Sequence, residues 1–428
     1  MTLNAPAQRT PEAMTRDQAL ALDAADPLAA LRQQFDLPAG LIYLDGNSLG
    51  PLPRATAARL QQVVTEQWGQ GLIGSWNSAG WMDLPRRIGD KIARLVGVAP
   101  GELVVTDSTS VNLYKVLGTA LAIATAASPR RRVILSERSN FPTDLYIAQA
   151  LAQERGCELV LADADALPQR LDDCTAVLLL THVNYRTGRL HDMATLSAAA
   201  RAAGALTVWD LAHSAGAVPL ALAQDGADFA VGCGYKYLNG GPGAPAFVWV
   251  KPCHVDRFWQ PLAGWIGHAA PFEFTPGYRP APGIARYQTG TPAILSLAAL
   301  ECGVDTLLAA EPLGGLRALR AKSQALTTLF AQRVQATCPD LALASPADAA
   351  QRGSQISLTH AEWAYPLVQA LIARGVIGDF RAPDVLRFGF TPMTLRHVDA
   401  WDAAEHLCAV LASGEWRRPE FQQRPAVT

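Results

Sequence analysis

Two short motifs place an acid and a lysine where they could act on the same ligand. The motif DLAH (210–213) ends an apolar run of strand length, and the motif GYKY (234–237) follows in a glycine-flanked segment. A carboxylate at a strand end can pair with a protonated ring nitrogen, and a lysine in an apolar, aromatic pocket can lose its proton and condense with an aldehyde. Pyridoxal phosphate requires both groups, because an amine forms its Schiff base and an acid keeps its pyridine nitrogen protonated. Asp210 and Lys236 are therefore the predicted partners of this cofactor.

Two further segments could hold the phosphate and the ring of the same cofactor. The segment 106–112 (TDSTSVN) lies between a predicted strand and a predicted helix, so its free backbone N–H groups and its hydroxyls could bind a phosphate. The segment 141–144 (FPTD) follows the next strand and offers an aromatic face beside a hydroxyl and a carboxylate. Taken singly, each piece also has an ordinary structural explanation: Asp210 as a helix cap, Lys236 as a loop lysine and Phe141 as a core residue.

Alternating strands and helices must position these motifs. Apolar runs of strand length alternate with segments of helical spacing, and glycines end several of the predicted helices. The predicted strands are 102–106, 131–137, 157–163, 175–183, 205–210 and 245–251, and the predicted helices are 54–71, 108–127, 141–156 and 192–204. Such βαβ repetition predicts the α/β class with a buried, mostly parallel sheet. Ligands of α/β sheets bind at the carboxyl ends of the strands, where Asp210 lies.

The pattern changes beyond about residue 295. A long helical segment at 313–337 and short strand-like segments at 354–360 and 385–390 predict a smaller α+β domain there. We therefore expect an N-terminal arm and short helix packing on the small domain (1–40), a large cofactor-binding domain (41–300) and a small C-terminal domain (301–428).

The composition limits the class of protein. The 428 residues are 50% hydrophobic and 17% charged, which supports a large core, and the net charge of -2 argues against nucleic acid or an anionic membrane as partner. Seven scattered cysteines without CxxC spacing predict reduced thiols and a cytoplasmic protein, and the histidines lack metal-ligand spacing, so no metal is expected. Because no strongly apolar run reaches the ~20 residues that cross a bilayer, no membrane span is predicted.

Together the motifs resemble the class V aminotransferase family of fold-type I pyridoxal phosphate enzymes, and within it the kynureninases. The resemblance covers roughly residues 41–400. It is carried by DGNSLG (45–50), STSVN (108–112), FPTD (141–144), THVNYRTG (181–188), DLAHSAG (210–216), GYKYLNGGPG (234–243), GWIGH (264–268) and LRFGF (386–390). It implies a large domain with a mostly parallel, seven-stranded sheet sandwiched by helices, followed by the smaller α+β domain.

The resemblance also implies a set of site residues. In that family the lysine at the position of Lys236 carries the cofactor as a Schiff base, Asp210 pairs with the ring nitrogen, and His213 and Tyr235 lie around the ring and phosphate. Further cofactor-binding positions implied in this way are Thr109, Ser110, Phe141, which would stack on the ring, Pro142, Thr143, Asp144 and Thr181. Arg387 resembles the arginine that receives an amino acid α-carboxylate, and its planar fork suits a bidentate ion pair. The ordinary alternative for Arg387 is a surface arginine on a strand.

The same resemblance implies a homodimer with active sites completed across the interface, since Trp265 and Thr291 would reach the phosphate from a neighbouring subunit. Some relatives carry Asn at position 291, and either side chain can donate a hydrogen bond. The implied reaction is the cleavage of L-kynurenine, or of its 3-hydroxy form, by water between Cβ and Cγ. The products would be anthranilate (or 3-hydroxyanthranilate) and L-alanine, in tryptophan degradation. Tyr235 could donate a proton to the departing carbon or hold the phosphate, and Ser48 lies in a turn that could approach the substrate.

Two other functions remain open from the sequence. A cysteine desulfurase or selenocysteine lyase shares the fold and the lysine, but it needs a reactive cysteine on a mobile, polar loop, and no cysteine after Lys236 lies in an obvious loop of that kind. A non-catalytic regulator that keeps the cofactor fold would need an output module, and no basic helix-turn-helix extension is evident. A Rossmann dehydrogenase is disfavoured because no strand is followed by GxGxxG opening a helix.

Overall fold

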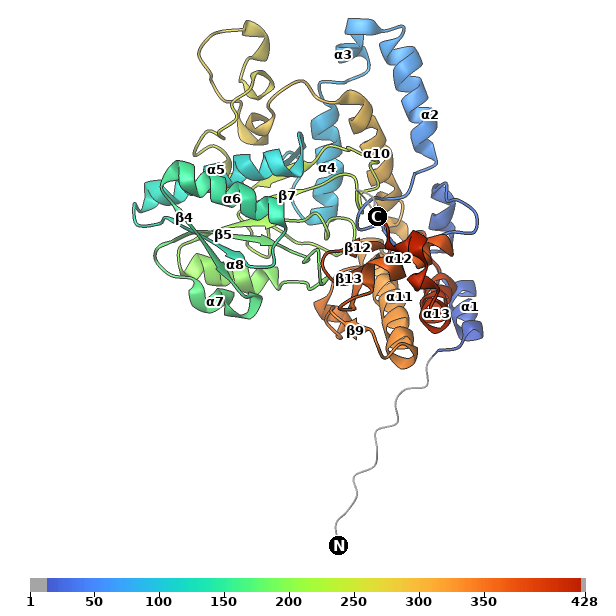
Figure 1. Cartoon of the computed structure of the whole chain (residues 1–428). Coiled ribbons are helices and arrows are strands. Elements are labelled where there is room, and N and C mark those ends of the chain that lie inside the picture. Colours follow the sequence, from blue (N-terminus) through green and yellow to red (C-terminus); the bar gives the residue numbers. More distant parts are fainter. Residues whose placement is uncertain (1–13, 425–428) are drawn as a thin grey trace.

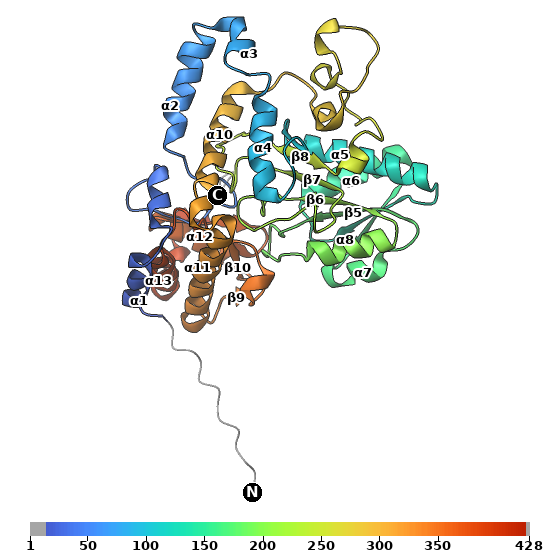
Figure 2. The same ribbon diagram turned by 180° about the vertical axis from the view of Figure 1, so that it is seen from behind.

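The structure is a computed structural model that describes residues 14–424, so the first part of the expected N-terminal arm, residues 1–13, lies outside the described residues. Figures 1 and 2 show a large α/β lobe and a smaller lobe beside it. The helices are α1 Arg16–Ala24, α2 Ala55–Gln62, α3 Ser75–Ser78, α4 Leu84–Val96, α5 Thr109–Ala127, α6 Pro142–Arg155, α7 Leu167–Arg170, α8 Met193–Ala202, α9 Pro252–Val255, α10 Ile294–Leu308, α11 Gly315–Thr337, α12 Ala364–Ala373 and α13 His397–Ser413.

The large domain is built on the seven-stranded, mostly parallel sheet that the sequence predicts. Its strand order is β2-β8-β7-β6-β5-β3-β4, and only β8 runs antiparallel to both of its neighbours. The strands are β2 Leu103–Val105, β3 Val133–Glu137, β4 Glu158–Ala162, β5 Thr175–Thr181, β6 Leu206–Asp210, β7 Phe229–Gly232 and β8 Phe247–Val250. The sequence analysis missed β7, because a strand of four residues that ends in a glycine is too short to show a period.

Helices cover both faces of this sheet, and alternate residues of each strand enter opposite cores. In β5, Leu178 and Leu180 join the core shared with α4, α8 and α10, whereas Val177 and Leu179 join the core shared with α5 and α6. Of the described helices, α5 alone is long and apolar enough to cross a membrane, but 61% of its apolar window is buried. It lies against α6 and strands β5 to β8, so its apolar residues form part of the domain core.

The small domain packs α11, α12 and α13 on an antiparallel sheet of order β12-β13-β10-β9. Its strands are β9 Ala342–Leu343, β10 Gln355–Thr359, β12 Asp379–Arg381 and β13 Val385–Gly389, and a separate parallel pair joins β1 Ile42–Tyr43 to β11 Val376–Ile377. Helix α1 lies against α13, where Arg16 pairs with Asp402 at 2.8 Å. The expected domain boundary at 300–301 falls inside α10. The helix packs on α2 and α4, so it belongs to the large domain.

Two segments project from the same side of the large domain in both views: the α2–α3 region and the loop that follows α9 (Figures 1 and 2). Both carry large apolar side chains in solvent. The exposed residues are Trp68, Leu72, Ile73, Trp259, Trp265, Phe272 and Phe274. Exposed apolar residues in such number mark an interaction surface more often than a free one.

Candidate active site

The predicted chemistry meets at the carboxyl ends of three neighbouring strands. Thr181 ends β5, Asp210 ends β6 beside it in register, and Lys236 follows β7. One cavity at these strand ends is lined by Thr109, Ser110, Phe141, Thr143, Asp144, Thr181, Tyr185, Asp210, Ala212, His213, Tyr235 and Lys236. The structure therefore brings together all the predicted site residues except Pro142, Trp265, Thr291 and Arg387.

Two buried carboxyl groups face each other in this cavity. Asp210 is 3% exposed and Asp144 is 2% exposed, and burial raises the pKa of both. The negative charge of Asp210 raises the pKa of Asp144 further, whereas the ammonium of Lys236 opposes the rise at Asp210. The backbone N–H of Ala212 donates to Asp210 Oδ1 at 2.8 Å and fixes its orientation. A buried pair of this kind favours a third group that carries positive charge or a proton.

The lysine lies beside a histidine that burial keeps neutral. Lys236 Nζ is 3.0 Å from His213 Nε2, and burial, followed by the charge of Lys236, lowers the pKa of His213 well below its usual value. His213 Nδ1 is buried and finds no hydrogen-bond partner in the described part of the chain. Burial also raises the pKa of the Tyr235 phenol, so that it stays protonated at neutral pH. Tyr235 therefore faces the cavity as a proton donor.

The phosphate-like end of the cavity is the start of α5. Ser108 caps this helix by accepting from the backbone N–H of Val111 at 3.3 Å, and Thr109 and Ser110 form its first turn. The positive end of the helix and its free N–H groups thus face the cavity. Ser108 caps the helix, as the first alternative predicts, and the next two hydroxyls line the cavity, where anion binding stays a prediction.

The segment 141–144 forms the start of α6. Pro142 occupies the first turn, where a missing N–H costs nothing, and it does not line the cavity. Phe141 is 39% exposed, which argues against a core role, and it meets Tyr185 edge to face at 5.3 Å between ring centres. Tyr185 was not singled out from the sequence, although it belongs to the motif at 181–188, whose first residue was.

Arg387 lies in the small domain, 2% exposed, and the alternative of a surface arginine is wrong. Its Nε donates to Asp379 Oδ1 at 2.8 Å, Nη2 donates to Ser48 Oγ at 2.7 Å, and Nη1 donates to the Tyr185 carbonyl at 3.0 Å. The guanidinium thus reaches a residue of the cofactor cavity. The sequence analysis predicts only that the turn with Ser48 could approach the substrate, because its contact with Arg387 joins residues 339 apart. It does not single out Asp379, whose pairing with Arg387 depends on the register of β12 and β13.

Trp265 and Thr291 line no part of the cavity within the same chain. Trp265 is 40% exposed in the short helix Trp265–Gly267 of the projecting loop, with Phe272 at 5.9 Å between ring centres, and Thr291 is also exposed.

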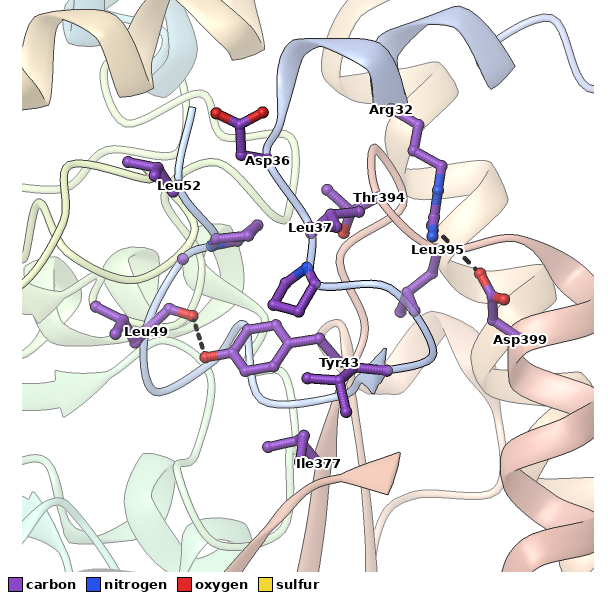
Figure 3. A pocket seen from close by; sticks show the side chains of 14 residues that line it. Arg32, Asp36, Leu37, Tyr43, Leu49, Leu52, Ile377, Thr394, Leu395 and Asp399 are labelled. Carbon is purple, nitrogen blue, oxygen red and sulfur yellow. Dashed lines mark hydrogen bonds and ion pairs between the residues drawn. The ribbon is translucent and has the colours of Figure 1, made fainter. Parts of the chain in front are cut away.

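A separate cavity of about 450 Å³ lies on the other side of the 45–50 turn (Figure 3). Its lining is mostly apolar. Tyr43 Oη donates to the Leu49 carbonyl at 2.8 Å there, and Arg32 pairs with Asp399 at 3.3 Å. None of the predicted site residues lines it, so this cavity is separate from the predicted chemistry.

The residues of the strand-end cavity fit the cofactor predicted for them. The buried acid pair suits a protonated ring nitrogen, Lys236 suits the aldehyde, and the start of α5 suits the phosphate. Fold and site together define a fold-type I pyridoxal phosphate enzyme.

Comparisons with known proteins narrow this class. Residues 319–407 match the kynureninase C-terminal domain family. A protein named kynureninase from Burkholderia pseudomallei (strain 1106a) is 57% identical, with 97% of this chain and 100% of that protein covered. The chain belongs to the kynureninase family, and it is therefore a pyridoxal phosphate-dependent hydrolase.

Solved structures show the same fold at much lower identity. A cysteine desulfurase from Thermococcus onnurineus NA1 superposes with a TM-score of 0.75 at 18% identity, covering 90% of this chain and 97% of that one. A C-DES mutant with glycine covalently linked to its pyridoxal phosphate cofactor superposes with a TM-score of 0.73 at 18% identity, covering 88% and 98%. These likenesses concern the fold alone.

Proposed function

We propose that this enzyme adds water across the Cβ–Cγ bond of L-kynurenine, or of its 3-hydroxy form, and releases anthranilate (or 3-hydroxyanthranilate) and L-alanine. The observation that carries the assignment of roles is the juxtaposition of Lys236, His213 and the buried Asp144–Asp210 pair in one cavity. Pyridoxal phosphate, when bound, supplies an electron sink that stabilises negative charge on the substrate carbon next to the amine. Every other step falls to the side chains of the chain itself.

Lys236 moves the proton that the reaction takes from Cα. Its Nζ lies at the cavity wall, 3.0 Å from His213 Nε2. Because the imidazole is neutral, it can accept a hydrogen bond from the lysine amine without adding a second positive charge. Asp210, with Asp144 behind it, holds a proton at the ring nitrogen. Tyr235 holds its phenolic proton and can donate it to the departing carbon.

Binding residues orient the substrate and the cofactor. Arg387 receives the substrate α-carboxylate, because its guanidinium reaches Tyr185 at the cavity wall. Thr109, Ser110 and the N–H groups of the first turn of α5 hold the phosphate, and Phe141 offers its face to the ring. Thr143 and Thr181 line the cavity together with Asp144 and would border the ring, and the Thr181 hydroxyl donates to Asp144 Oδ2 at 3.4 Å.

Cysteine placement does not favour the desulfurase alternative. None of the seven cysteines, all of which lie in the described part of the chain, lines the cavity. Cys233 is the residue closest to it in sequence, but burial raises the pKa of its thiol, and its Sγ rests 3.6 Å from the Ala212 carbonyl. A thiol held in this way is a poor sulfur acceptor.

The test is turnover of L-kynurenine by purified protein loaded with pyridoxal phosphate, followed by anthranilate fluorescence and alanine release. We expect the parent to form both products and Lys236→Ala to form neither, with a loss of more than ~10³-fold. Loss of the visible cofactor band in the variant reports the attachment separately. Sulfide release from L-cysteine without anthranilate would instead establish the desulfurase.

We also propose a cytoplasmic homodimer in which Trp265 and Thr291 complete the partner's site. Support comes from their exposure, their absence from the cavity of their own chain, and the apolar side chains of the projecting segments. Buried in a two-fold interface, these segments would lose unfavourable contact with water.

Mixing two inactive variants tests the shared site. Lys236→Ala carries intact Trp265 and Thr291, and the double variant Trp265→Ala/Thr291→Ala carries an intact lysine. A hybrid dimer regains one complete site, so random mixing should restore roughly a quarter of parental activity. Each variant alone should stay inactive or nearly so, and no recovery on mixing, with hybrids verified by mass, would overturn the proposal.

A further inference from the structure

Charged side chains of strand β12 contact Arg387 and have no role in the function proposed above. Asp379 faces Arg387 across the antiparallel pair β12–β13, and the two residues are direct register partners. Arg381 lies two residues further along β12, on the same face, and its Nη2 is 2.7 Å from Asp379 Oδ2. Ser48, from the 45–50 turn, donates its hydroxyl to Asp379 Oδ2 at 2.7 Å. The cluster therefore contains two guanidinium groups and one carboxylate that contacts both.

Asp379 holds Arg387 from the side. It accepts from Nε at 2.8 Å and from Nη2, which is the side-on form of a bidentate pair. The Nη1–Nη2 edge then points to the Tyr185 carbonyl and the Ser48 hydroxyl. Of the five N–H donors of the guanidinium, one on Nη1 has no hydrogen-bond partner within residues 14–424, and a second contacts only a neutral hydroxyl. A carboxylate can take both by displacing Ser48.

Charge balance explains why a second arginine is needed. A single Asp379–Arg387 pair would be neutral and would attract a carboxylate only weakly. Arg381 restores a positive charge as long as the neighbouring Asp45 is protonated, and burial and the charge of Asp379 raise the pKa of Asp45 to about 7. Burial, and then the charge of Arg387, lowers the pKa of Arg381. Both arginines also lower the pKa of His213, so their field reaches the cofactor cavity.

We propose that Asp379 and Arg381 are positioning residues of the carboxylate subsite: Asp379 turns the Nη1–Nη2 edge of Arg387 toward the substrate, and Arg381 keeps the subsite cationic. The inference rests on the proposed role of Arg387 in binding the substrate carboxylate.

The experiment compares Arg381→Gln with Arg381→Lys, which retains the charge, in the cofactor-loaded enzyme. Dissociation constants are read from the change in cofactor absorbance on titration with L-kynurenine and with its carboxamide, which lacks the negative charge. For L-kynurenine we expect Arg381→Gln to raise the dissociation constant and KM about tenfold, with kcat within about twofold, and Arg381→Lys to stay within about threefold of the parent. Binding of the carboxamide should be unchanged in both variants.

Asp379→Asn supplies the second arm. The substitution removes a negative charge, which by itself favours carboxylate binding, but it also removes the side-on grip that orients Arg387. Because a bidentate pair requires that orientation, we expect L-kynurenine binding to weaken about tenfold and kcat to fall as well. Equal weakening of carboxylate and carboxamide by Arg381→Gln, or no weakening of either, would overturn the inference. Arg387→Gln tests the proposed role of Arg387 separately from the roles of Asp379 and Arg381. If Arg387→Gln weakens binding of L-kynurenine and of its carboxamide equally, Arg387 does not bind the carboxylate, and the inference about Asp379 and Arg381 fails with it.

Discussion

The two ends of the proposed site carry unbalanced charges of opposite sign. At the strand ends of the large domain, the carboxyls of Asp144 and Asp210 face a single lysine. In the small domain, Arg387 and Arg381 share the carboxylate of Asp379. The first arrangement has two carboxyl groups for one lysine, and the second, while the neighbouring Asp45 is protonated, has two guanidinium groups for one carboxylate. A protonated ring nitrogen and a substrate carboxylate supply these missing charges.

Two buried ion pairs elsewhere in the chain each join one acidic group to one basic group. Lys322 pairs with Asp26 at 2.7 Å with both side chains less than a tenth exposed, and His254 lies 3.0 Å from Asp228. Each of these buried acids has a basic partner of its own. Because an unmatched buried charge costs stability, its retention at two places on one site indicates a ligand that provides the match.

Removal of the acid that faces the ring nitrogen should have the largest effect. We expect Asp210→Asn to lower kcat by about 10³-fold, because an amide cannot hold the ring proton, and Asp144→Asn, one step further away, by only about tenfold. Steady-state rates of anthranilate formation measure both. Equal losses in the two variants would mean that the pair acts as a unit and that Asp210 has no special position.

The cationic end should respond to pH through Asp45. Burial, and then the charge of Asp379, raises the pKa of Asp45 to about 7. Above that pH the carboxylate adds a negative charge beside the arginines, so KM for L-kynurenine should rise about fivefold between pH 6 and pH 8, as expected for one screened charge. The charged and titratable groups that interact with Asp45 are Tyr43, Tyr237, Asp379, Arg381 and Arg387.

Asp45→Asn is the matched control for this pH dependence. Its KM should stay near the low-pH value of the parent throughout the range, since the amide does not ionise. A rise in KM of equal size in the variant would assign the dependence to another group and remove Asp45 from the comparison.

The smallest effect concerns the stability of the cofactor-free protein. A carboxyl whose pKa is raised by folding lowers stability as pH increases above its ordinary value, here 3.8. The free energy of unfolding of cofactor-free Asp144→Asn should therefore exceed that of the cofactor-free parent by about 1 kcal/mol. This difference should increase from pH 5 to pH 8. Urea unfolding at the two pH values measures it. A variant that is less stable at pH 8 would show that Asp144 is not an unmatched charge.

Much of the fold could be predicted from the sequence because local patterns carried it. The continuous apolar run of β5, the cap and hydroxyls that start α5, and the Pro and Gly that bound α6 are all local signals. The short strand β7 carried no such signal. The boundary at 300–301 was misplaced because helix spacing in α10 does not reveal which domain its apolar face packs on.

The same distinction between local patterns and long-range packing applies to the site. The sequence by itself determined the identity of the reactive groups, since an acid at a strand end, a lysine among aromatic residues and hydroxyls at a helix start have meaning within a few residues. Only the tertiary structure decided how they meet. Asp144 faces Asp210 because the start of α6 and the end of β6 border the same cavity, and Ser48 and Asp379 hold Arg387 because the 45–50 turn packs against β12 and β13. The balance of charge at each end depends on side chains that come from different elements, such as Asp144 of α6 and Asp210 of β6, and no local pattern encodes their meeting.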